Sequence, residues 1–281
     1  MKSTFISIQP QNPRLREYIK CYYLHYNKDP AFRESIIYYP NYTTTINAYF
    51  KSRVSWDNNE RTHTAINRDN LEVLLVGKIN RTRAIRMLGP FYKIGIVFHP
   101  LGLNHFIDES LSTIVEEHFS FFNYYGKSFY ELLKKLESEC RIEIIRDSLD
   151  DYFLKQFVGF SEFRIKEAVK LILKSEEELK VGELAKMLNI SRKTLHRLFK
   201  KHLAFSVQDY LSMVKFRKAL NLFYASDQSR NLTDIALQSN YYDSSDFSNR
   251  LRSITGNSPR QLFSKLKVIE KGLFWDIEHS G

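Results

Sequence analysis

The chain has 281 residues, a formal net charge of +10 and only two cysteines, Cys21 and Cys140. No apolar run approaches the roughly twenty residues that a membrane span needs, and the polar N-terminus is unlike a signal peptide. The cysteines form no Cys-x-x-Cys pair, so we expect reduced thiols, no metal site and a cytoplasmic protein. The sequence has no Walker loop, no Gly-rich dinucleotide fingerprint and no Gly-x-Ser-x-Gly elbow, which argues against an enzyme and against a bound cofactor.

The first 160 residues predict strands followed by helices. Runs rich in β-branched and aromatic residues alternate with turn signals such as Asn58-Asn59 and Gly89-Pro90. Strands first and helices after predict an α+β fold, with a small β-barrel or sandwich flanked by helices. The expected strands cover 35–39, 43–50, 71–76, 84–88 and 94–98; the expected helices cover 13–23, a segment from Ser128 with a Ser128-x-x-Glu131 capping box, and 141–157.

A first helix-turn-helix unit is predicted over residues 181–201. A short helix with Leu184 and Ala185 on its inner face is followed by a tight turn at Asn189-Ile190. Ser191 can then cap a second helix, whose apolar positions recur at intervals of three and four residues. The opposite face of that second helix is polar and basic, as a helix entering a major groove requires. It presents Arg192, Lys193, His196, Arg197, Lys200 and Lys201.

A second unit with the same plan is predicted over residues 232–252. Asn240 tolerates a left-handed turn, and Asp243 or Ser244 can cap the second helix of this unit. One long helix over 207–224 joins the two units. The outer side of the second recognition helix carries Ser244, Ser245, Ser248, Asn249 and Arg252.

These motifs carry a resemblance to a known family. The pattern includes Leu184-Ala185, Ile190-Ser191, Leu195-x-Arg197-x-Phe199-Lys200, Tyr210-Leu211, Ala219-x-x-Leu222, Asp234-Ile235-Ala236, Phe247-Ser248 and Thr255-Gly256-x-Ser258-Pro259. Because of this pattern, residues 165 to 263 resemble the DNA-binding domain of the AraC/XylS family of bacterial transcription regulators. The resemblance implies an all-α double helix-turn-helix domain that binds double-stranded operator or promoter DNA. It also implies contacts to DNA from the outer residues named above for both recognition helices, with the exception of Lys201.

The sequence departs from the family pattern at a few positions. Asn240-Tyr241 replaces the usual Gly-Phe, Ala204 replaces a common Gly, and Lys215 replaces the Arg typical of the linker helix. Asn is the next best residue for a positive φ, so we expect the second turn to form. Asn249 stands where many members carry Arg, which weakens the expected hold of the second unit on DNA.

Charge is concentrated in the C-terminal part of the chain. Residues 161–271 hold 21 Lys and Arg against 12 Asp and Glu, a net of +9, whereas the rest of the chain has a net of +1. A basic region that coincides with the helix-turn-helix repeats is typical of a nucleic-acid-binding module. We therefore expect three parts: a regulatory domain over 1–160, a DNA-binding domain over 161–271 and a C-terminal tail over 272–281.

Two interpretations of the regulatory domain remain open. It is either a sensor of a small molecule or chiefly a dimerisation module that makes a homodimer; an enzyme with an appended DNA-binding domain is a distant third. Residues 91–102 resemble a segment of some AraC-type sensor domains. For the sensor we expect Tyr38, Tyr49 and Arg86 to contact the effector, because a ligand pocket combines aromatic walls with a few polar groups. His99 and His105 have no common metal-ligand spacing and are expected to be structural.

Overall fold

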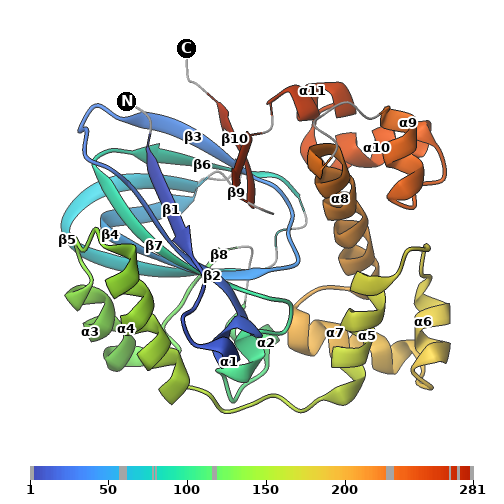
Figure 1. The fold of residues 1–281 in the computed structure, drawn as a ribbon, viewed down its shortest axis with the longest axis horizontal. Coiled ribbons are helices and arrows are strands. Elements are labelled where there is room, and N and C mark those ends of the chain that lie inside the picture. Colours follow the sequence, from blue (N-terminus) through green and yellow to red (C-terminus); the bar gives the residue numbers. More distant parts are fainter. Residues whose placement is uncertain are drawn as a thin grey trace.

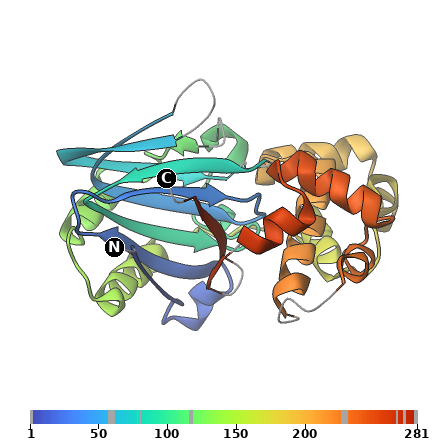
Figure 2. The same cartoon turned by 90° about the horizontal axis from the view of Figure 1, so that it is seen from above.

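The computed structural model describes residues 3–56, 62–77, 79, 81–115, 119–225, 231–265, 267–270 and 273–278. A curved β-sheet with helices against it forms one side of the molecule, and a group of helices forms the other (Figures 1 and 2). The expected α+β class is confirmed: the N-terminal part is rich in sheet and the C-terminal part is helical. The expected turn at Asn58-Asn59 lies outside the described residues.

Ten of the described strands form one sheet. The order along the sheet is β1-β2-β7-β4-β5-β6-β3-β10-β9, and β8 pairs with β5. Every pairing is antiparallel except a short parallel one between β5 and β6. The described pairings follow an open path, so they do not close into a barrel. The strands are β1 Thr4–Ile8, β2 Ile19–Asn27, β3 Arg33–Tyr38, β4 Thr44–Trp56, β5 Thr62–Val76, β6 Arg83–Leu88, β7 Phe91–Phe98, β8 Phe119–Phe121, β9 Lys267–Glu270 and β10 Leu273–Glu278.

Helices cover one face of this sheet. Helices α3 and α4 pack into the main apolar core through Leu133, Ile145, Leu149 and Phe153, all fully buried. Burying side chains of this size stabilises the fold by roughly 1.5–3 kcal/mol each. The N-terminal helices are α1 Pro13–Arg16, α2 Leu111–Ile114, α3 Gly126–Lys135 and α4 Ile142–Lys155.

Two local predictions for this part are wrong. The helix expected over 13–23 ends at Arg16, and β2 begins at Ile19. Almost every residue of β2 is buried, because β2 lies between β1 and β7 and is covered on both faces, so no alternation of polar and apolar residues marks it. The expected capping box at Ser128 is also absent, since α3 begins earlier, with Tyr125 as its N-cap.

The C-terminal helices follow the predicted plan. Two short helix-turn-helix units, α6 with α7 and α9 with α10, are joined by the long helix α8 (Figure 1). The first unit packs with α5 and the first half of α8 in one apolar cluster, and the second unit packs with the rest of α8 in another. The helices are α5 Phe163–Lys174, α6 Val181–Met187, α7 Arg192–Leu203, α8 Val207–Ala225, α9 Leu232–Gln238, α10 Ser244–Thr255 and α11 Pro259–Lys265.

The chain returns to the N-terminal sheet after α11. Strand β10 pairs antiparallel with β3, and β9 pairs with β10. Figure 1 shows this hairpin beside the sheet. Of the expected tail, Gly272 and residues 279–281 lie outside the described residues, and Leu273–Glu278 is a strand of the sheet.

Candidate nucleic-acid interface and neighbouring cavities

The first recognition helix, α7, is held at both ends by the residues that the sequence singled out. The Ser191 hydroxyl accepts a hydrogen bond from the Thr194 backbone N–H at 3.0 Å, which caps the helix start. Asn189 makes the preceding turn with a φ of 49°, and Ala204 ends the helix with a φ of 60°. The apolar stripe of α7 is buried, as expected. The residues predicted to face DNA, Arg192, Lys193, His196, Arg197 and Lys200, are all exposed.

The second recognition helix, α10, has the same construction. The Asp243 carboxylate accepts a hydrogen bond from the Asp246 N–H at 2.7 Å, and Asn240 makes the turn with a φ of 66°. Phe247 and Leu251 are fully buried, which fixes the face that α10 turns outward. On that face Ser244, Ser245, Asn249 and Arg252 are exposed, while Ser248 is half-buried and donates to the Ser244 carbonyl at 2.8 Å.

One aromatic side chain near α10 was not predicted. Tyr242 lies in the turn before the helix and is 86% exposed, the largest value among the exposed large hydrophobic residues described. Its neighbour Tyr241, which replaces the usual Phe of the family, is buried against Phe247. Tyrosine occurs both in cores and at surfaces, so no local pattern predicted that the Tyr242 ring lies exposed.

Comparison with known proteins locates the same region. The profile of a family described as a helix-turn-helix domain matches residues 184–265. The HTH-type transcriptional activator RhaS of Enterobacter sp. (strain 638) is 35% identical over 86 residues, which is 31% of this chain and 30% of that protein. RhaS of Escherichia fergusonii is 31% identical over 134 residues, 48% of this chain and 43% of that protein. The C-terminal helices belong to the AraC/XylS family.

The remaining comparisons add no activity for this chain. The chain spans less than half the length of either RhaS protein. Residues 7–120 match a family described only as a domain of unknown function, DUF6597. Among solved structures, the C-terminal domain of AraT from Geobacillus stearothermophilus aligns with 39% of this chain and 90% of its own at 24% identity and a TM-score of 0.35. ToxT from Vibrio cholerae O395, bound to (E)-4-(8-methylnaphthalen-1-yl)but-3-enoic acid, aligns with 92% of this chain and 97% of its own at 11% identity and a TM-score of 0.43.

In the N-terminal part, the structure brings together two of the three residues expected to contact an effector. Tyr38 and Tyr49 both face the ammonium group of Lys93, which lies 5.4 and 5.0 Å from their ring centroids. The Lys93 Nζ also donates a hydrogen bond to the Tyr38 hydroxyl at 2.9 Å. Arg86 is exposed, and its neighbours Ile85 and Met87 point into the core instead.

The fully buried Lys93 is the feature that sequence reasoning missed. A third ring, Tyr23, lies 5.3 Å from its ammonium group, and burial lowers the Lys93 pKa to about 7. Burial, and then the charge of Lys93, lower the pKa of the buried His25. Lysine at a strand position is normally exposed, so nothing in the local pattern indicated this arrangement.

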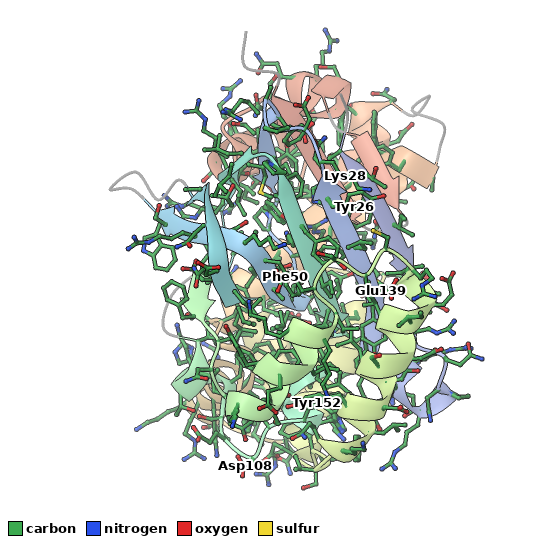
Figure 3. The ribbon with its side chains drawn as sticks, turned by 90° about the vertical axis from the view of Figure 1, so that its left-hand side faces the viewer. Tyr26, Lys28, Phe50, Asp108, Glu139 and Tyr152 are labelled. Atoms are coloured by element: carbon green, nitrogen blue, oxygen red, sulfur yellow. The ribbon has the colours of Figure 1, made fainter. Side chains whose placement is uncertain are left out.

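Among the residues that the structure describes, a wide groove and a smaller hollow border the sheet. A wide groove of about 1040 Å³ lies where strand ends meet the α3–α4 connection. Figure 3 shows this face, with Tyr26, Lys28 and Phe50 above the two helices and Glu139 at the turn between them. Tyr92 forms part of its wall and donates hydrogen bonds to the carbonyls of Leu136 and Glu139. A smaller hollow of about 50 Å³ lies between the sheet and α8.

His105, one of the two histidines with no common metal-ligand spacing, lies among aromatic rings. His105 stacks on Tyr18 with ring centroids 4.0 Å apart and contacts Phe157 and Phe160. Burial lowers its pKa to about 4, so the ring is neutral at pH 7.

Across the part of the chain that the structure describes, no helix is long and apolar enough to cross a membrane.

Proposed function

We propose that the protein is a sequence-specific DNA-binding transcription regulator that inserts α7 and α10 into two adjacent segments of the major groove. The observation that supports this most is the pair of recognition helices, each capped at its start, anchored by buried apolar residues and polar on its outer face. The single helix α8 joins the two units, so their spacing is set by one continuous element. The charge of +9 over residues 161–271 favours approach to the phosphate backbone.

Genome-wide mapping of bound DNA tests this proposal. We expect the full chain to occupy a limited set of discrete sites upstream of genes, and the shared sequence of those sites would define the operator. A matched chain with His196→Ala and Asn249→Ala, which changes one outer residue on each recognition helix, should lose these sites. Uniform or absent occupancy by the unmodified chain would contradict the proposal.

We further propose that the N-terminal part modulates DNA binding in response to a small molecule. The groove of about 1040 Å³ supports a sensor, because it is large enough for a metabolite and has aromatic side chains with a few charged groups. The alternative, a domain that only dimerises, is favoured by exposed apolar residues such as Trp56 and Phe121, whose ring centroids lie 5.5 Å apart. A metabolite screen that follows thermal unfolding of the full chain tests the sensor. The mass of the full chain in solution tests the domain that only dimerises.

The division near residue 160 remains part of this proposal. Helix α4 ends at Lys155 and α5 begins at Phe163, with Gly159 in a left-handed conformation between them, which supports a boundary there. Limited proteolysis of the full chain should then release a fragment cut within 156–162, and resistance of this segment would contradict the boundary.

A further inference from the structure

The turns of the two helix-turn-helix units differ in length by one residue. In each turn an asparagine with a positive φ is followed by a residue whose backbone N–H donates to an alanine carbonyl of the preceding helix. These bonds join Ile190 to Ala185 and Tyr241 to Ala236, each at 3.0 Å. In the first unit the N-cap Ser191 follows Ile190 directly. The second unit inserts Tyr242 between Tyr241 and its N-cap Asp243.

The side chain of this additional residue is turned outward. The inward position of the turn is already filled by Tyr241, which is 6% exposed and lies 5.0 Å from the Phe247 ring. The backbone N–H of Tyr242 donates to the Asp246 carboxylate at 3.4 Å, which holds the residue at the start of α10. The Tyr242 side chain is left 86% exposed. It contributes little to the stability of the free chain, because only apolar area removed from water stabilises a fold.

The two recognition helices present different chemistry at equivalent positions. Aligned at their N-caps, Leu195 and Phe199 of α7 correspond to Phe247 and Leu251 of α10, and all four are fully buried. The outer faces therefore correspond as well. The first unit has Arg192, Lys193, His196 and Arg197 where the second has Ser244, Ser245, Ser248 and Asn249. The second unit thus depends more on neutral donors for contacts to the phosphate backbone.

Tyr242 lies where a helix in the major groove meets the sugar-phosphate backbone. When the first turn of α10 enters the groove, the residue before the N-cap lies at the edge of the groove. A tyrosine hydroxyl is a neutral group that donates hydrogen bonds to phosphate oxygens, and its ring offers apolar area beside that donor. Next to the exposed Ser244 and Ser245, Tyr242 extends the surface that the second unit offers to DNA.

We propose that the Tyr242 hydroxyl donates a hydrogen bond to one DNA phosphate at the edge of the segment that α10 enters, and that the ring packs against the adjoining deoxyribose. This contact has no counterpart in the first unit, because Ser191 follows Ile190 without an intervening residue. It gives the second unit affinity that does not come from a cationic side chain. The inference rests on the proposed function, since it requires α10 to bind in the major groove.

DNA titrations of the full chain test the contact on duplexes that the unmodified chain selects from a random pool. Tyr242→Phe removes only the hydroxyl and should raise the Kd about tenfold; Tyr242→Ala also removes the ring and should raise it about thirtyfold. Neither change should alter the dependence of log K on log salt, because a neutral side chain releases no counterion from DNA. Tyr130→Phe, at an exposed tyrosine of α3, is the control and should bind as the unmodified chain does.

A scan with single methylphosphonates locates the phosphate. Each duplex has one charged phosphate oxygen replaced by a methyl group, at successive positions along both protected segments. At one position beside the second segment, we expect the loss of affinity to be about tenfold smaller in Tyr242→Phe than in the unmodified chain, because two changes to one contact are not additive. At every phosphate of the first segment, the losses should be equal in the two chains.

The outcomes separate this contact from the proposed function. Equal Kd values for the unmodified chain and Tyr242→Phe on the selected DNA would overturn the contact and leave the proposed function intact. Equal methylphosphonate losses in the two chains at every position would also overturn it, because Tyr242 would then act without contacting a phosphate. An unmodified chain that selects no DNA sequence would refute the proposed function and the contact together.

Discussion

At the scale of single residues, the outer face of α7 concentrates the groups that can contact DNA. His196 lies at its centre, exposed, with Lys193 three residues before it and Lys200 four residues after it. An imidazole offers one donor and one acceptor, so it can recognise a base edge, whereas the flanking lysines act mainly on phosphate. Arg197 is suited to both roles.

We predict that His196→Ala weakens binding to the cognate site by about 1–3 kcal/mol and weakens binding to random DNA far less. The reason is that a lost base contact affects only the sequence that supplied it. Fluorescence anisotropy at fixed salt measures both affinities. An equal loss on the two DNA molecules would mean that His196 does not contact a base.

We predict that Lys93 makes stability rise with pH. Its pKa is about 7 in the folded chain and near its usual 10.5 in the unfolded chain, so between these values the unfolded chain binds a proton that the folded chain lacks. The free energy of unfolding therefore increases as pH rises through this window. Lys93→Met should flatten that increase in urea unfolding measured from pH 7 to 9.5. His25 titrates below the window, because its pKa is lowered. If the free energy of unfolding rose equally with pH in the unmodified chain and in Lys93→Met, the result would contradict the burial of Lys93.

At the scale of elements, the two recognition helices carry different charge. Helix α7 presents Arg192, Lys193, Arg197 and Lys200, whereas α10 begins with acidic Asp243 and Asp246 beside exposed serines. Asp246 also forms an ion pair with Arg250 at 3.3 Å, which reduces what that arginine can offer to phosphate. The first unit should therefore supply most of the electrostatic affinity for DNA. The second unit should bind DNA mainly through shape complementarity and hydrogen bonds.

We predict that replacing Lys193 and Arg197 with Gln flattens the dependence of log K on log salt by about two phosphate contacts. The matched variant, with Arg250 and Arg252 replaced by Gln, should flatten it less. Salt titrations of both double variants against the unmodified chain provide the measurement. The opposite order would show that α10 is the dominant contact to the backbone.

The elements that the sequence predicted well are those with local signals. Ser191, Asn189 and Asn240 mark caps and turns through their own backbone preferences, and the structure places all three as expected. Strand β2 was mistaken for a helix because its residues are buried on both faces, which erases the period of two. The hollow beside α8 was missed for a different reason: Arg217 reaches Pro40 across 177 positions of the chain, and no local pattern encodes such a contact.

At the scale of the whole molecule, the C-terminal helices contact the N-terminal part at several points. Asn104 donates to the carbonyl of His202 at the end of α7, at 3.1 Å. Thr82 donates to the carbonyl of Ile254 near the end of α10, and Arg217 of α8 bonds to the segment after β3. Both recognition helices and the helix between them thus contact connecting segments of the N-terminal part, and a change in those segments can alter the orientation of the helices.

Selection of bound sequences from a pool of random DNA by the full chain, followed by hydroxyl-radical footprinting, tests the central claim most directly. Because α7 and α10 are joined by one helix, we predict two protected major-groove segments on one face of the duplex, with centres about one helical turn, roughly 10 base pairs, apart. His196→Ala should relax the selected sequence in one segment, and Asn249→Ala should relax it in the other. A pool with no sequence enrichment, or a single protected segment affected by both substitutions, would contradict recognition by two helices.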